Sequence, residues 1–116
     1  MSVIVFTANP KALLAEIKAA IDNSGNEGGI NTWEYDRDGD FTHTPEQWAK
    51  KAWLRPHVGS GILQFGLLGQ IGVTMSKTIY GVYHGRFLEM LLSHFDDRFS
   101  NGSVTAQKDS MVDKFK

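Results

Sequence analysis

The chain has 116 residues, of which 41% are hydrophobic and 22% charged, and its net charge at pH 7 is -1. This balance argues against a dedicated binder of nucleic-acid phosphates, which needs a cluster of uncompensated cations. The absence of cysteine excludes disulfides, zinc–thiolate sites, iron–sulfur clusters and thiol nucleophiles. The length fits one domain that folds without a cofactor.

The N-terminal region predicts a strand followed by a helix. Residues 3–6 form a short β-branched and aromatic run. Asn9 is then placed to cap a helix that begins at Pro10, where a missing N–H costs nothing. The apolar side of this helix comprises Leu13, Leu14, Ile17, Ala20 and Ile21.

No segment has the features of a leader or a membrane span. The first apolar run is too short for a signal peptide, and no stretch approaches the ~20 apolar residues that span a bilayer. We therefore expect a cytoplasmic protein that does not bind membranes.

Two hairpins follow the first helix. Asp38-Gly39 favours a two-residue turn that places Tyr35 opposite Thr42. The second hairpin is predicted from Ala52 to Leu68, with its loop at residues 59–61. The acidic residues around the first turn, at positions 36, 38 and 40, resemble the start of a calcium loop. The required glycine and bidentate glutamate are missing further on, so we expect a turn of solvated acids and no metal.

A long apolar helix is predicted from about Thr74 to Phe99. Its apolar arc is wider than one sheet needs, so we expect a second cover. Gly81 and Gly85 are one turn apart, and a glycine inside a helix costs ~1 kcal/mol relative to alanine. They indicate a notch that receives either the first helix or the same helix of a second subunit. The expected interface comprises Gly81, Gly85, Leu88, Leu92 and Phe95.

The same helix carries the candidate catalytic residues. If the protein is an enzyme, His84 is the expected acid or base, with Arg86, Tyr80 or Tyr83 beside it. No carboxylate lies one turn from His84 to orient it, because Tyr80 and Leu88 occupy those positions. We therefore expect a hydrogen-bonded structural histidine rather than a catalytic one.

The only basic cluster of the sequence is short and lies beside two tryptophans. It comprises Lys50, Lys51, Arg55 and His57, near Trp48 and Trp53. Cations beside aromatic side chains can bind single strands, but packed tryptophans with solvated lysines are the simpler interpretation. Nucleic acid is therefore not the expected partner.

Three segments of the chain resemble a family of small bacterial proteins of unassigned function. They are residues 38–44, residues 80–87 (Tyr-Gly-Val-Tyr-His-Gly-Arg-Phe) and residues 93–97. The resemblance covers most of residues 1–100. It implies a bacterial cytosolic protein and no particular activity.

Together these patterns predict an α+β fold with the order β-α-β-β-β-β-α. An antiparallel sheet of four to five strands should carry both helices on one face. Residues 1–99 are the expected domain, and residues 100–116 a polar, partly ordered tail in which residues 103–106 have the composition of an edge strand. The expected function is a non-catalytic interaction module that self-associates through its last helix. The alternative is a small enzyme or ligand-binding protein with a pocket near His84, Arg86 and Tyr83.

Overall fold

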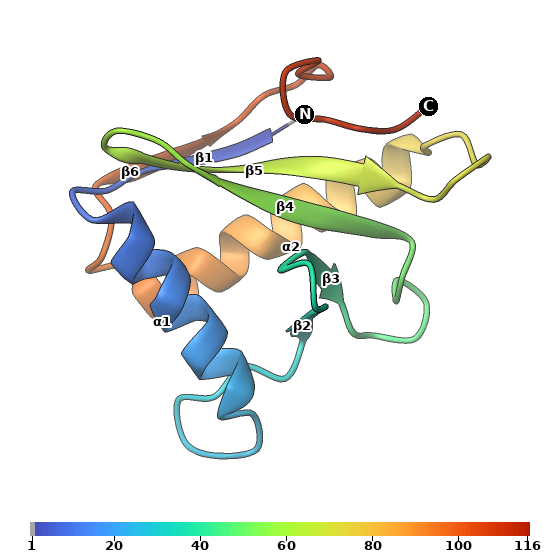
Figure 1. Cartoon of the computed structure of the whole chain (residues 1–116). Helices are drawn as coiled ribbons and strands as arrows, with labels where there is room; N and C mark the ends of the chain where they lie inside the picture. Colours follow the sequence, from blue (N-terminus) through green and yellow to red (C-terminus); the bar gives the residue numbers. More distant parts are fainter. Residues whose placement is uncertain (1) are drawn as a thin grey trace.

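The computed structural model describes residues 2–116 as one antiparallel sheet with two helices (Figure 1). The strand order in the sheet is β2-β3-β4-β5-β1-β6. The elements are β1 (Ser2–Phe6), α1 (Pro10–Asp22), β2 (Trp33–Tyr35), β3 (Phe41–His43), β4 (Ala52–Val58), β5 (Ile62–Gly69), α2 (Lys77–Phe95) and β6 (Asn101–Val104).

The predicted class is confirmed, and the predicted strand count is wrong. The sheet has six strands instead of four to five, and the element order continues past α2 as β-α-β-β-β-β-α-β. The additional strand, β6, pairs with β1 from Phe6–Asn101 to Val3–Val104. Its sequence, Asn-Gly-Ser-Val, lacks the alternation of apolar and polar residues that marks a half-buried strand. All four residues are exposed.

Both helices begin at side-chain caps. The Asn9 side chain accepts a hydrogen bond from the Ala12 amide at 3.3 Å, and Pro10 is the first helical residue, as predicted. The Ser76 hydroxyl accepts from the Ile79 amide at 3.0 Å. This cap explains why α2 begins at Lys77 and not at Thr74.

The first hairpin differs from its predicted register by one residue. Trp33 pairs with His43 and Tyr35 with Phe41, so the connecting loop spans residues 36–40. Gly39 has φ +84° and donates a hydrogen bond to the Asp36 carbonyl at 3.0 Å. A turn followed by a left-handed glycine makes a longer loop than the two-residue turn that we expected.

A single face of the sheet carries the core. Val3 pairs with Phe65, and Leu54 with Leu67, and paired residues share a face. Both helices pack against this face, on the lower side of the sheet in Figure 1. Aromatic rings fill the centre, with the Phe87 ring centroid 4.6 Å from that of Phe65 and 4.9 Å from that of Trp33.

The C-terminal residues lie against the other face and edge of β5 (Figure 1). A Cβ atom at Gly66 would be 2.3 Å from the Val112 carbonyl oxygen. The Leu67 amide donates to the Asp113 carboxylate at 2.7 Å, and the Lys114 amide donates to the Leu67 carbonyl at 2.8 Å. The pairing of β5 with β1 ends at Gly66, and the end of the chain forms hydrogen bonds with the next residue of β5, Leu67. Within residues 2–116, neither helix has the length and apolar character needed to cross a membrane.

Candidate functional site

The residues proposed for catalysis do not meet in one cleft. Tyr83 is fully buried and His84 is 1% exposed. The Tyr83 hydroxyl donates to the Trp48 carbonyl and also lies 3.0 Å from the Thr42 hydroxyl. Tyr83 therefore connects α2 to the segment between β3 and β4, which is a structural role.

His84 and Tyr80 lie together near the first turns of α2. His84 Nδ1 is 2.6 Å from the Tyr80 carbonyl oxygen, and the two rings are 4.9 Å apart. Burial, with a smaller effect from the negative charge of Asp113, raises the pKa of Tyr80 to about 12. Tyr80 is thus a neutral phenol at physiological pH and a poor acid.

Arg86 lies apart from these residues, beside a polar cavity of about 360 Å³ between α2 and the first hairpin. Its guanidinium is 3.8 Å from the Glu89 carboxylate, and both side chains are more than half exposed. The cavity is lined by side chains that include His43, Trp48, Arg86, Glu89, Ser93 and His94.

His43 is the residue of this cavity that the sequence did not identify. The observed register, in which His43 pairs with Trp33, turns its side chain inward, where it stacks on Trp33 at 4.5 Å. Nδ1 lies 2.7 Å from the Thr32 carbonyl oxygen, so Nδ1 carries the proton. Burial lowers the pKa of His43, the bond to Thr32 opposes this, and Arg86 lowers it further. His43 is therefore neutral near pH 7.

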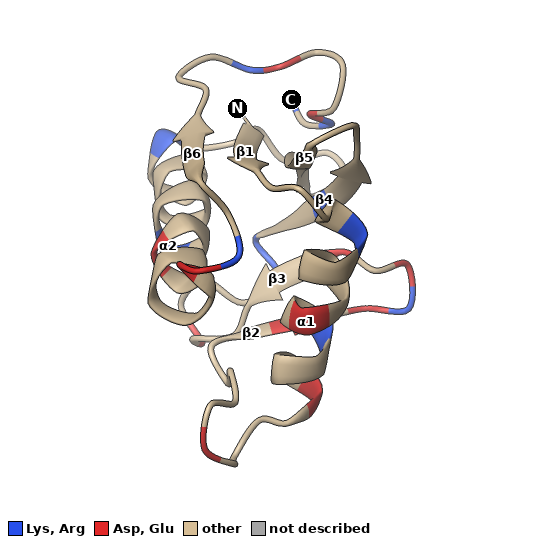
Figure 2. Ribbon diagram, turned by 90° about the vertical axis from the view of Figure 1, so that its left-hand side faces the viewer, with Lys and Arg blue, Asp and Glu red and all other residues tan. Residues whose placement is uncertain are grey.

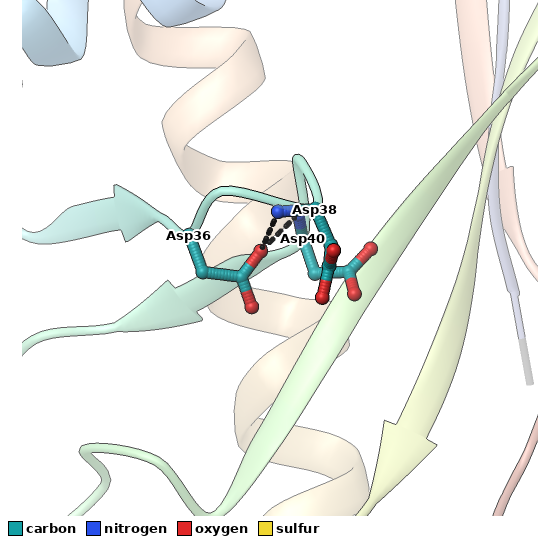
Figure 3. Close-up of side chains that lie close together, drawn as sticks. All are labelled: Asp36, Asp38 and Asp40. Atoms are coloured by element: carbon teal, nitrogen blue, oxygen red, sulfur yellow. Dashed lines mark hydrogen bonds between the residues drawn. The ribbon is translucent and has the colours of Figure 1, made fainter.

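The three aspartates of the first hairpin lie close together, with carboxylate oxygens within 4.8 Å of one another (Figure 3). One Asp36 oxygen accepts from the amides of Asp38 and Asp40, at 3.0 Å each. The Asp40 carboxylate receives two bonds from Arg55, at 2.9 and 2.7 Å. These acids hold the turn and neutralise a cation of β4. Of the expected basic cluster, Arg55 is thus already paired.

The expected interface residues fall into an exposed group and a buried one. A Cβ atom at Gly81 or Gly85 would meet nothing within 4 Å, and Leu92 is 53% exposed. Leu88 is half-buried beneath β6, whereas Phe95 lies in the core and not on this surface. We call Gly81, Gly85, Leu88 and Leu92 the α2 surface. Figure 2 shows that α2 lies along one side of the molecule, below β6.

An open cavity of about 600 Å³ adjoins this surface at the start of α2. Met75, Tyr80 and Gly81 line it on one side, and Ala106 and Phe115 on the other. The C-terminal segment, which we expected to be a partly ordered tail, therefore supplies one wall. No sequence signal places Phe115 beside Tyr80, because their contact depends on the return of the chain to β5.

Comparison of the chain with protein-family models, with curated protein sequences and with solved structures gave no match.

Proposed function

We propose that this protein is a non-catalytic interaction module that joins two copies of itself through the α2 surface. The observation that carries the proposal is the exposure of Leu92 beside two helical glycines with open space around them. Each glycine destabilises an isolated helix by ~1 kcal/mol relative to alanine, and no atom of residues 2–116 occupies the space that it leaves. Close packing of a second helix against these glycines would explain why they are present in the middle of a helix.

The contacts of α1 support a partner from outside the protomer. Leu13, Ile17 and Ile21 of α1 pack in the core, and α1 contacts strands β2, β4 and β5. Of the two partners that we expected for the notch, α1 and a second subunit, α1 therefore does not occupy it within residues 2–116. A symmetric dimer brings the same surface of two chains together, and it is the commonest assembly of soluble proteins.

We favour this function over the alternative of a small enzyme. Tyr83 and His84 are sealed in the core, and Arg86 points to a different region. The cavity beside Arg86 contains neutral His43 and the weakly paired Glu89, but no arrangement of nucleophile, base and orienting group. Small-molecule binding there would be independent of the α2 surface.

The test is the concentration dependence of the molar mass, measured by sedimentation equilibrium over a roughly hundredfold range of protein concentration. We expect the wild-type protein to reach the mass of two chains. Leu92→Asp should remain a monomer, because it places a charge in an apolar contact.

The matched control is Ile71→Asp, which makes the same chemical change at a fully exposed residue outside α2. It should associate as the wild type does. A wild-type protein that keeps the mass of one chain at every concentration, or a Leu92→Asp variant that still dimerises normally, would contradict the proposal.

A further inference from the structure

We infer that the two copies of α2 pair antiparallel about a two-fold axis that passes midway between Gly85 and Leu88. This inference rests on the proposed self-association and adds the direction and register of the contact. It follows from one stripe of residues along α2, which are separated by four, four, three, four and four positions. The stripe is Lys77, Gly81, Gly85, Leu88, Leu92 and Asp96.

The spacing of the stripe reads the same in both directions. When a second copy is laid against it with reversed direction, each glycine faces a leucine and the lysine faces the aspartate. The facing pairs are Lys77 with Asp96, Gly81 with Leu92, and Gly85 with Leu88. Each pair occurs twice in the dimer, because a two-fold contact uses the same surface of both chains.

The shape of the surface fits this register. Both glycines leave open space, and Leu92 projects from the surface with more than half of its area exposed. In the antiparallel register Leu92 of one copy meets Gly81 of the other, at the mouth of the cavity that Met75, Tyr80 and Phe115 line. A projecting side chain thus meets a hollow with an apolar wall.

The charges at the ends of α2 provide a second, independent argument. Lys77 is the first helical residue and Asp96 the C-cap, so each lies at the end where the helix dipole disfavours its charge. Both side chains are exposed, and within residues 2–116 neither forms an ion pair. Antiparallel pairing places each beside an opposite charge and beside the favourable end of the partner's dipole. Parallel pairing would instead place like charges together.

The experiment exchanges the two charges and measures the dimer dissociation constant at low ionic strength. Lys77→Asp and Asp96→Lys should each weaken the wild-type association by about tenfold, because each reversal acts twice in a symmetric dimer. The double variant should regain wild-type affinity. An equimolar mixture of the two single variants should form heterodimers, since every facing pair is then of opposite charge.

The controls are Lys11→Asp and Asp97→Lys, which change the same charges at exposed positions outside the stripe. Each should stay within about twofold of the wild type. If Leu92→Asp abolishes dimerisation but the mixture of single variants forms no heterodimer, the register is overturned while the proposed function stands. A monomeric wild type overturns both.

Discussion

At the residue scale, the buried hydroxyl of Tyr83 is best explained as part of the structure. It donates to the Trp48 carbonyl and contacts Thr42, whose own hydroxyl donates to the Ala52 carbonyl at 2.9 Å. This group of bonds ties α2 to two segments of the first half of the chain. Removing the Tyr83 hydroxyl takes away one of the two donors to the Trp48 carbonyl, whose other donor is the Lys51 amide at 3.3 Å.

We therefore expect Tyr83→Phe to lower the free energy of unfolding by about 1–2 kcal/mol, measured by urea denaturation. Tyr35→Phe is the matched control, because the Tyr35 hydroxyl donates to Asp22 at the exposed surface and its loss should cost under about 0.5 kcal/mol. Equal effects in the two variants would show that the Tyr83 hydroxyl has no special structural role.

His43 predicts a pH dependence of stability. Its pKa is lowered in the folded protein, chiefly by burial, from the ordinary 6.5 of the unfolded chain. As the pH falls through 6.5, the unfolded state takes up the proton first, so the free energy of unfolding decreases. The decrease ends once folded His43 is also protonated, and well above pH 6.5 the residue contributes no pH dependence.

Replacing His43 by glutamine should make the loss of stability between pH 7 and acid smaller than in the wild type. The measurement is the change in free energy of unfolding with pH, which separates titration from the lost ring contact with Trp33. His57→Gln, which removes an imidazole at an exposed position, is the matched control. A wild-type acid response in the His43 variant would refute the assignment.

The surroundings of His43 and Tyr83 could not be predicted from the sequence. The environment of His43 depends on the hairpin register, and the observed register differs from the predicted one by one residue. A difference of one residue turns every side chain of a strand to the other face. The neighbours of Tyr83 come from β3 and the following loop, and no local pattern indicates that contact.

At the scale of elements, the contact between β5 and the C-terminal segment leaves no space for an added methyl group. Gly66→Ala would place its Cβ 2.3 Å from a backbone carbonyl, so the segment must move. We expect a loss of about 1–3 kcal/mol in stability and faster tryptic cleavage at Lys108 and Lys114. Ser60→Ala, in an exposed loop, should change neither property. Unchanged cleavage in Gly66→Ala would mean that the segment is not held over Gly66.

The elements with strong local signals were predicted well. The cap at Asn9 and the proline after it located the start of α1, and the second hairpin lies where its loop glycines indicated. β6 and the segment after it carry little apolar periodicity. The composition of residues 103–106 indicated an edge strand, whereas β6 spans Asn101–Val104, because its position is set by hydrogen bonds to a strand distant in sequence.

At the scale of the whole molecule, the predicted class and the single antiparallel sheet are correct because the order of the elements restricts the topology. The protomer buries only part of the wide apolar arc of α2. Tyr83, Phe87, Met90, Leu91 and Phe95 are buried by the protomer, while Leu92 is not. The exposed apolar part of α2 is therefore smaller than we expected from the sequence. Both glycines of the α2 surface are open, whereas of its two leucines only Leu92 is exposed.

The position of β1 between β5 and β6 has a consequence during synthesis on the ribosome. Both neighbours of this strand are translated much later than the strand itself. Val3 and Val5, which are fully buried in the folded protein, therefore stay exposed in an unpaired, apolar segment until β5 and β6 have been translated. Nascent chains of this protein thus have a period of exposure to aggregation that the finished fold no longer reveals.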